Sequence, residues 1–443
     1  MSVLKSDRAG LARAVADNLV IAADPAARGA SVVFWKDGRP WTQAVAHAVR
    51  TTGDQQIRSL GERLLDDPAD SRRHAALVSL LLERDPDEPP AAAIFELAWA
   101  AECNSRLGYH LGPRYAADVA DVSLDDLRSL PPGIPLAAEQ DAEVLVIVPF
   151  RDRAGGNRLR NLLACLLALR DQSYPRDGYR VTVVETDGVA RWRDVIAPYA
   201  DHYLFAANSG DFNKSWAVNV GAVHSPGHAE VICILDADVL ADRDFVARNA
   251  GRFRSPGTGG HLTYRDMFCL DPAASSWAIG QRLLRCLPQA DPDHLRGFLL
   301  RRPPGCCVWT RTAAFHRISG MDERYEGWGG EDYDFAHRLD LAAPLDTYDD
   351  WLLHMHHPAS SRLTSEGHQV NAHIPSLSWQ PTEPIGRLDR FAAAEGGGTA
   401  SAGEAWPRSC QISRRTAEPD RSKPDSPRSG LADPSARWTR PGS

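Results

Sequence analysis

The sequence predicts an α/β fold, with a mostly parallel sheet flanked by helices, between a mainly helical region and a disordered tail. Three observations predict this organisation. Apolar residues recur at helical spacing before residue 139, short apolar runs alternate with helix-length segments in residues 140–392, and Gly, Pro, Ser and Arg dominate residues 393–443. The chain has 443 residues, 43% of them hydrophobic, which is enough for a substantial core and more than one domain.

Residues 1–139 are predicted to form a mainly helical accessory domain. Residues 72–83 and 91–106 are rich in Ala and Leu at helical spacing. The segment Ser31-Val-Val-Phe-Trp35 is the one strand predicted early in the chain. The Pro-rich segment 130–135 indicates the domain boundary. This region carries no catalytic signature, so we expect it to contact a partner or a substrate.

Residues 140–392 are predicted to form the α/β domain. Apolar runs without polar alternation are typical of strands covered on both faces, and the segments between them supply the crossovers that parallel strands require. The predicted strands are Val144–Val148, Val181–Val184 and Val231–Leu235, and the predicted helices are 157–170, 191–199 and 215–224.

Charge and composition exclude several classes of function. The net charge is -8, which provides no overall attraction to nucleic acid. No apolar stretch is long enough to span a membrane, and no secretion signal is evident, so we expect a cytoplasmic protein, either free or peripheral at the inner membrane face. The eight cysteines form no C-x-x-C pair, which argues against a zinc ribbon. The tail, 393–443, has too few apolar residues to fold.

An Asp-Ala-Asp segment, Asp236 to Asp238, directly follows the third predicted strand. The Asp-x-Asp pattern occurs five times in the chain, but only this copy follows an apolar run. Its carboxylates are therefore predicted to emerge at the carboxyl edge of the sheet, where such folds bind ligands. There they could hold Mg2+ or Mn2+ and, through it, a diphosphate. The alternative is an Asp pair that caps a helix starting near Asp242.

Two further segments carry candidate site residues. In Gly327-Trp-Gly-Gly-Glu-Asp-Tyr-Asp334, the glycines allow close approach to a ligand, and Glu331 and Asp332 fall at a predicted helix start, which favours ionised carboxylates. The alternative is a simple helix cap with a glycine hinge. In Trp351-Leu-Leu-His-Met-His-His-Pro358, three histidines could supply an imidazole to the same metal, or could merely be exposed.

Four motifs follow one another along the predicted α/β domain: Val148-Pro-Phe-Arg-Asp-Arg153, Phe212-Asn-Lys-Ser-Trp-Ala-Val-Asn-Val-Gly221, Leu235-Asp-Ala-Asp-Val239 and Gly327-Trp-Gly-Gly-Glu-Asp-Tyr-Asp334. In this order and spacing they resemble the beta-1,4-galactosyltransferases and the galactosyltransferase-like members of the family 2 glycosyltransferases. The resemblance covers about residues 144–358 and implies a GT-A fold, a UDP-sugar donor, Mn2+ (or Mg2+) and inversion at the sugar carbon.

The resemblance also implies roles for individual residues. It assigns the metal to Asp238, His354 and His357, with His354 in place of the family's Met and with His356 as an alternative to either histidine. It makes Asp332 the catalytic base and Glu331 a donor-sugar contact at the catalytic centre. It implies that the following residues bind the nucleotide sugar: Pro149, Phe150, Arg151, Arg153, Phe212, Asn213, Lys214, Asp236, Trp328, Gly329 and Gly330. Lys214 stands where relatives carry Arg, and Asp152 where they carry Asn.

The expected function is the metal-dependent transfer of a hexose or N-acetylhexosamine, with galactose favoured, to a hydroxyl group. The acceptor could be a saccharide, a lipid-linked glycan or a small metabolite, and the helical domain could contact it. One alternative is a non-catalytic scaffold that binds nucleotide sugars. Another is a sugar-nucleotide pyrophosphorylase, although the segment after the first strand lacks the expected glycine-rich phosphate loop.

Overall fold

The computed structural model describes residues 6–137, 140–255, 257–327, 329–358 and 370–391, all within one compact unit. The tail predicted for residues 393–443 lies outside the described residues, as does Trp328. In the described part, no helix combines the length and the apolar character that a membrane span needs.

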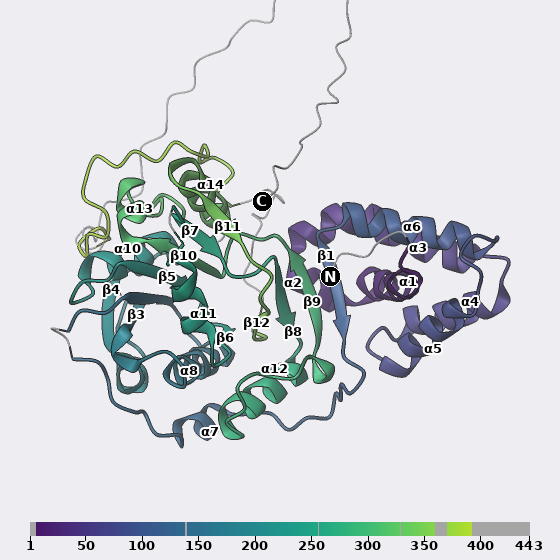
Figure 1. Ribbon diagram of the computed structural model, residues 1–443, viewed down its shortest axis with the longest axis horizontal. Coiled ribbons are helices and arrows are strands. Elements are labelled where there is room, and N and C mark those ends of the chain that lie inside the picture. Colours follow the sequence, from purple (N-terminus) through teal and green to yellow (C-terminus); the bar gives the residue numbers. More distant parts are fainter. Residues whose placement is uncertain (1–5, 138–139, 256, 328, 359–369, 392–443) are drawn as a thin grey trace, which may run out of the picture. The chain divides into compact units, whose positions relative to one another are not determined.

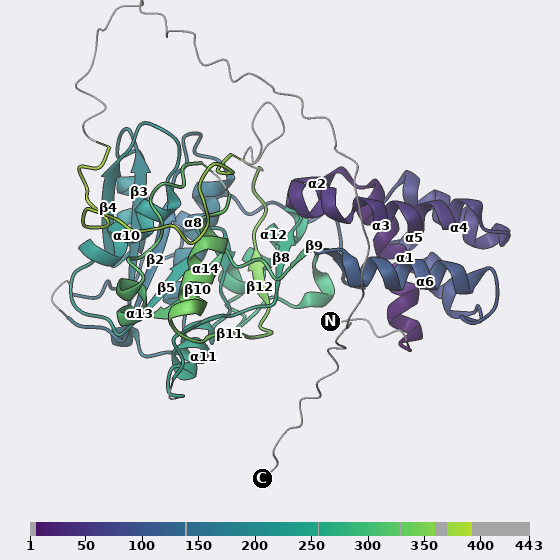
Figure 2. The same ribbon diagram turned by 90° about the horizontal axis from the view of Figure 1, so that it is seen from above.

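The N-terminal region is helical, as the apolar spacing predicts. Aspartates cap four of its helices with their side chains: Asp7, Asp24, Asp54 and Asp70 each accept hydrogen bonds from first-turn N–H groups. The helices are α1 (Arg8–Ala23), α2 (Pro25–Ala30), α3 (Val32–Thr51), α4 (Gln55–Asp66), α5 (Ser71–Leu82) and α6 (Ala91–Asn104). They group together on the side of strand β1 (Leu107–Leu111), against which α1 and α3 pack (Figures 1 and 2).

The strand predicted at Ser31–Trp35 is wrong. Ser31 is the N-cap of α3, and its hydroxyl accepts a hydrogen bond from the N–H of Phe34. The β-branched pair after Ser31 favours a strand locally, but α3 packs along α1 and α6 and buries one helical face that includes Phe34 and Val45. This tertiary packing outweighs the local preference.

A seven-stranded, mostly parallel sheet forms the centre of the α/β region (Figure 1). Strand β10 (Cys307–Arg311) runs antiparallel to both of its neighbours, whereas the other pairs are parallel. The order is β11 (Leu345–Thr347), β7 (Gly260–Leu262), β10, β5 (Val231–Leu235), β2 (Val144–Phe150), β3 (Tyr179–Asp187) and β4 (His202–Ala207). The three predicted strands are confirmed as parts of β2, β3 and β5.

Helices cover both faces of this sheet. Along β2, Val144, Val146 and Val148 join a core cluster with α8 (Asn157–Arg170), whereas Leu145 and Ile147 join a second cluster with α10 (Lys214–His224). This alternation explains why β2 is buried at every position and reads as a continuous apolar run. The predicted α/β fold class is thus confirmed. The remaining helices are α7 (Leu124–Arg128), α9 (Arg193–Ile196), α11 (Phe245–Arg252), α12 (Pro272–Ile279), α13 (Thr312–Arg317) and α14 (Glu331–Ala342).

A second, five-stranded sheet joins the N-terminal region to the α/β region. Its order is β1, β9 (Arg296–Arg301), β8 (Asp266–Leu270), β12 (Leu352–His354) and β6 (Val239–Leu240). Strand β1 pairs antiparallel with β9 over five residues, although it lies before the predicted boundary at residue 139. The division into domains at residues 139 and 392 stays a prediction.

Candidate active site

The predicted acidic residues converge on one lysine. Asp236 follows β5, Asp332 lies in the first turn of α14, and Lys214 begins α10. The Lys214 ammonium lies 2.7 Å from Asp236 Oδ1 and 3.0 Å from Asp332 Oδ1. Three segments that are far apart in the sequence therefore meet at a single buried cation.

Burial and the attraction between Lys214 and its carboxylates set the pKa values of these groups. Burial alone lowers the pKa of Lys214, but the carboxylates of Asp236, Asp332 and Glu331 outweigh it and raise this pKa well above its usual value. Burial raises the pKa of Asp332, and Lys214 only partly offsets this effect. For Asp236 the lysine outweighs burial, so the pKa of this carboxyl is lowered. Lys214 is thus a permanent cation between two carboxylates of unequal basicity.

Glu331 is the most strongly perturbed carboxyl of the site. Burial, followed by repulsion from Asp332, raises its pKa to about 7. One carboxylate oxygen accepts a hydrogen bond of 3.0 Å from the N–H of Gly329. A carboxyl with this pKa exchanges protons near neutral pH, so Glu331 can donate as well as accept hydrogen bonds.

We expect Glu331→Gln to stabilise the metal-free protein at pH 8. In the wild type, a folded-state pKa of about 7 against 4.5 in the unfolded chain means that stability falls as the pH rises from about 4.5 to about 7. The loss corresponds to about 3 kcal/mol at most, since one pH unit is worth ~1.4 kcal/mol. Urea unfolding at pH 5 and pH 8 measures it, with the exposed Glu326→Gln as the control. An equal effect of both substitutions at both pH values would contradict the buried, raised carboxyl.

The three predicted metal ligands lie together. One ligand atom each from Asp238, His354 and His357 can be chosen so that all three lie within 4.8 Å of one another. His357 Nε2 is 3.4 Å from Asp238 Oδ2. His356 is not part of this group: its backbone N–H donates to Ser275 Oγ, and burial lowers the pKa of its ring.

Asn161 of α8 holds Asp238 in place, and the sequence pattern gave no signal for it. Its amide donates a hydrogen bond of 2.9 Å to Asp238 Oδ1 and one of 3.1 Å to the carbonyl of His356. The N–H of Met355 donates to the carbonyl of Asp238, which ties the histidine segment to the turn after β5. Asn161 is fully buried inside α8, so its amide is available only to these partners.

The motif that ends β2 carries two arginines, whose guanidinium groups contact the end of β3 and the segment that follows β4. Pro149 and Phe150 are buried at the end of β2. The Arg151 guanidinium donates to the carbonyls of Thr186, Asn208 and Gly210, and it lies 5.6 Å from the ring of Phe212. Arg153 lies 3.3 Å from Asp187 and also donates to the carbonyls of Ser209 and Gly210. Both arginines thus position the loop that carries Phe212.

Asn213 and Asp152 each accept hydrogen bonds from backbone N–H groups at the start of a helix. Asn213, predicted to contact the substrate, is fully buried: it caps α10 by accepting from the N–H of Trp216, and it donates to the carbonyl of Glu323. Its side chain therefore supports the start of α10, and its contact with a substrate stays a prediction. Asp152, which stands where relatives carry Asn, accepts from N–H groups at the start of α8, including Gly156 and Leu159. A carboxylate is favourable there because of the helix dipole.

The glycine-led turn before α14 has the backbone that its sequence predicts. Gly327, Gly329 and Gly330 have φ values of 73°, 111° and 97°, which side-chain-bearing residues rarely adopt. A different glycine also matters: a Cβ on Gly305 would lie 2.2 Å from Asp332 Oδ2. Gly305 therefore leaves the room that the Asp332 carboxylate occupies, and no motif indicated it.

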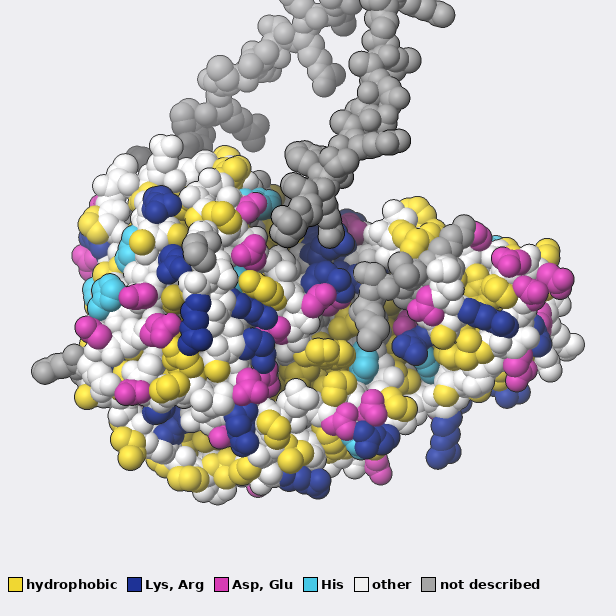
Figure 3. Space-filling model, viewed as in Figure 1, with side chains coloured by type: hydrophobic (Ala, Val, Ile, Leu, Met, Phe, Trp, Pro, Cys, Tyr) yellow, Lys and Arg dark blue, Asp and Glu magenta, His cyan; other side chains and the backbone are white. Residues whose placement is uncertain are grey.

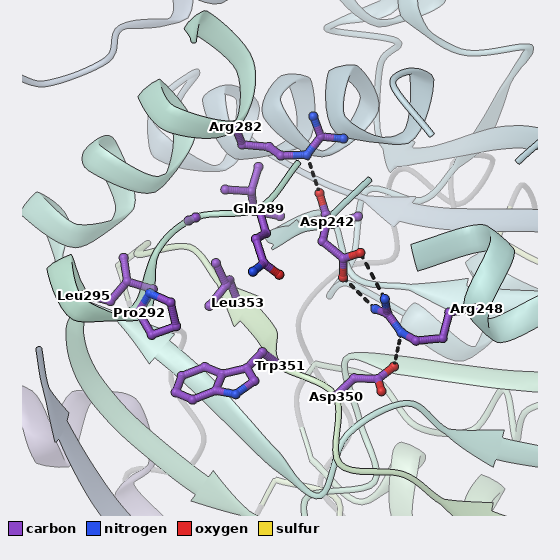
Figure 4. A pocket seen from close by; sticks show the side chains of 12 residues that line it. Asp242, Arg248, Arg282, Gln289, Pro292, Leu295, Asp350, Trp351 and Leu353 are labelled. Carbon is purple, nitrogen blue, oxygen red and sulfur yellow. Dashed lines mark hydrogen bonds and ion pairs between the residues drawn. The ribbon is translucent and has the colours of Figure 1, made fainter. Parts of the chain in front are cut away.

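A cavity of about 330 Å3 lies near this site but contains none of the predicted residues. Leu240 and Leu353, which face each other across β6 and β12, line it, whereas the next residue, His354, belongs to the metal group. Figure 4 shows Arg248 between Asp242 and Asp350 on one wall, with Trp351 opposite. Because successive side chains of a strand alternate, Leu353 and His354 lie on opposite faces of this sheet.

Family comparisons agree with this geometry. Residues 145–318 match the model of glycosyl transferase family 2, and residues 301–343 match the model described as the N-terminal domain of galactosyltransferase. Residues 145–318 are a family 2 glycosyltransferase domain. The predicted enzyme class and the GT-A fold are thereby confirmed. No curated protein matches the chain.

Three solved glycosyltransferase structures are similar to part of the chain, each with a TM-score below 0.5. A Pyrobaculum calidifontis mannosyltransferase in complex with GDP-Man and Mn2+ is 19% identical, with 53% of this chain and 62% of that chain covered and a TM-score of 0.33. Drosophila β1,4-galactosyltransferase 7 with xylobiose is 17% identical over 51% of this chain and 77% of that one, with a TM-score of 0.31. S. aureus TarS is 18% identical, with 48% of this chain and 37% of that chain covered and a TM-score of 0.34. The chain thus spans less than two thirds of the length of the mannosyltransferase and of TarS.

Proposed function

We propose that this glycosyltransferase moves a hexose or N-acetylhexosamine, galactose-type favoured, from a UDP-sugar to a hydroxyl acceptor with inversion. One observation carries the proposal: the candidate metal ligands lie beside Asp236, which shares the Lys214 ammonium with Asp332. His354 and His357 are close enough to Asp236 to contribute to its lowered pKa. The acceptor would be a saccharide, a lipid-linked glycan or a small metabolite.

The residues present fit a divalent metal. Asp238, His354 and His357 would hold it, and a set of one carboxylate and two imidazoles suits Mn2+ better than the all-oxygen set that Mg2+ prefers. Asn161 fixes the carboxylate orientation, as supporting hydrogen bonds do at protein metal sites. When bound, the metal supplies positive charge that stabilises the departing diphosphate.

The donor would lie along the ends of β2 and β5. Phe212 and the Arg151 guanidinium beside it form a half-buried face suited to a flat base. Arg153, whose side chain is about half exposed, can turn towards phosphate oxygens. The choice of uracil follows from the resemblance of the motifs.

Asp332 would act as the base in a single displacement. Its carboxylate takes the proton of the acceptor hydroxyl while that oxygen bonds to the anomeric carbon and the bond from this carbon to the diphosphate oxygen breaks. The raised pKa makes Asp332 a stronger base than an exposed aspartate. Glu331 would hydrogen-bond the donor sugar from the adjacent position.

We expect Lys214→Met to move the acidic limb of the rate profile to higher pH. Transfer requires ionised Asp332, so the rate falls as the pH drops through its pKa, and loss of the lysine raises that pKa further. The shift should be about one pH unit or more, because an oppositely charged neighbour at this distance has an effect of that size. Lys214→Arg retains the charge, so its rate should fall at the same pH as that of the wild type. If the rate of Lys214→Met also fell at the wild-type pH, Lys214 would not be the group that lowers the pKa of Asp332.

A panel of nucleotide sugars tests the proposal. The full chain is incubated with UDP-galactose, UDP-N-acetylgalactosamine, UDP-glucose and GDP-mannose, with and without Mn2+, and release of the nucleotide and the melting temperature are measured. We expect UDP release and stabilisation with a UDP-sugar, only when Mn2+ is present. Equal release without metal, or pyrophosphate release from UTP and a sugar phosphate, would contradict the proposal.

A further inference from the structure

We propose that the acceptor is an anionic glycan whose carboxylate or phosphate is bound by Arg302 and Arg106 beside Asp332. This inference rests on the proposed function and narrows its acceptor class. It gives the N-terminal region a defined part in the reaction, because Arg106 follows α6. Figure 3 shows a group of Lys and Arg side chains above β9, on the side of the N-terminal helices.

Arg302 is held in place by its backbone while its side chain is left available. It follows β9 with a φ of 53°, an uncommon conformation for a residue with a side chain. Its N–H donates to the carbonyl of Arg265 at 2.6 Å, and its carbonyl accepts from the Arg106 guanidinium at 2.5 Å. The side chain is exposed and makes no ion pair with any residue that the structure describes. Uncommon backbone conformations of this kind cluster at ligand sites.

Arg106 is a second cation without a carboxylate among the described residues. Its guanidinium donates to three uncharged oxygens: the carbonyls of Arg301 and Arg302 and the Tyr333 hydroxyl, the last at 2.8 Å. It also stacks on the ring of Phe34 at 4.1 Å. These contacts fix its position but leave its charge uncompensated.

The neighbouring arginines show the contrast. Arg301 pairs with Glu102 at 2.6 Å, and Arg265 pairs with Asp266 at 3.2 Å. The surrounding surface therefore supplies carboxylates for two arginines and none, within the described residues, for Arg302 and Arg106. The Arg106 guanidinium contacts the backbone of Arg302, so an Arg302 side chain turned towards it would place two guanidinium groups around one anion. The planar guanidinium group binds carboxylates and phosphates through paired hydrogen bonds.

Neighbours of Asp332 connect both arginines to the base in space. Tyr333, which contacts Arg106, directly follows Asp332. Gly305 lies against the Asp332 carboxylate. Arg302 is three positions before Gly305, so the Cα atoms of Arg302 and Gly305 are at most about 10 Å apart. A hydroxyl bound at Asp332 and an anionic group on the same or the next sugar would therefore reach both positions.

A binding experiment with three matched probes tests the inference. A hyaluronan tetrasaccharide supplies carboxylates, a glycerol phosphate tetramer supplies phosphates, and chitotetraose is neutral. Each is titrated into the full chain with Mn2+ and UDP. We expect one anionic probe to bind at least about tenfold more tightly than chitotetraose, with a preference that shrinks as salt is raised, and the preferred probe identifies the anion.

Variants of Arg302 connect the binding to this site. Arg302→Gln should weaken binding of the anionic probe about tenfold, and Arg302→Lys should restore part of it. Arg302→Gly removes the charge where the backbone has positive φ, so it should lose binding without lowering the melting temperature. Arg72→Gln, on the exposed face of α5, is the matched control and should change nothing.

Equal affinity for neutral and anionic probes, no binding of either anionic probe, or an Arg302→Gln variant that binds like the wild type would overturn the inference. Mn2+-dependent UDP release from the donor alone, with water as the acceptor, separates this failure from failure of the proposed function. If release occurs and anions are not preferred, the acceptor inference is wrong and the transferase proposal stands. If no nucleotide sugar gives release, the proposed function is wrong and the inference falls with it.

Discussion

Asp332→Asn is expected to reduce sugar transfer by about 100- to 10,000-fold, the usual contribution of a general base. Asn has nearly the same shape but cannot accept the proton. Donor binding should remain nearly intact, because Asp332 contacts Lys214 and not the candidate metal ligands. Turnover of the identified donor and acceptor, together with UDP-sugar affinity, measures the two effects separately.

Asp340→Asn provides the control for this variant. Asp340 is exposed on the same helix, α14, so its substitution makes the same chemical change without touching the site. It should retain wild-type turnover. Turnover near the wild-type level in Asp332→Asn would show that another group accepts the proton, and Glu331 would then be the first candidate because its pKa is about 7.

Asp238→Ala is expected to weaken Mn2+ binding by 100-fold or more and to remove metal-dependent donor binding. Asp238 supplies the one carboxylate of the candidate metal group, and loss of even a residue that only supports a ligand typically costs 10- to 100-fold in affinity. Titration calorimetry with Mn2+, with and without UDP, measures the loss.

The exposed Asp349→Asn is the control for metal binding, since Asp349 lies just before β12 but outside the metal group. Its Mn2+ affinity should equal that of the wild type. If Asp238→Ala bound Mn2+ and UDP as the wild type does, the ligand assignment would be wrong, while the glycosyltransferase family assignment would be unaffected.

The parts of the fold that depend on local pattern could be predicted from the sequence. Strand β5 and helix α8 have the bounds that their apolar runs indicate, and α14 begins at Glu331 as the glycine-led motif suggests. The proximity of Asp236 and Asp332 was implied by the resemblance of the motifs, and both carboxylates contact Lys214.

The parts that depend on contacts distant in the sequence could not be predicted. Asn161 supports Asp238 across 77 residues, and the Arg106 guanidinium reaches Tyr333 across 227. The need for a glycine at position 305 arises only because Asp332 packs against it. The segment at Ser31–Trp35 illustrates the reverse error, in which a local preference for strand is overridden by helix packing. None of these features has a periodicity that a single sequence would reveal.

The most direct test of the account is the position of Mn2+ in crystals of the full chain grown with UDP and Mn2+, measured by anomalous diffraction at the manganese edge. The account predicts a peak bound by Asp238, His354 and His357, on the same side of the sheet as the Asp332 carboxylate. A peak bound by other residues, or a nucleotide bound far from Phe212 and Arg151, would contradict it.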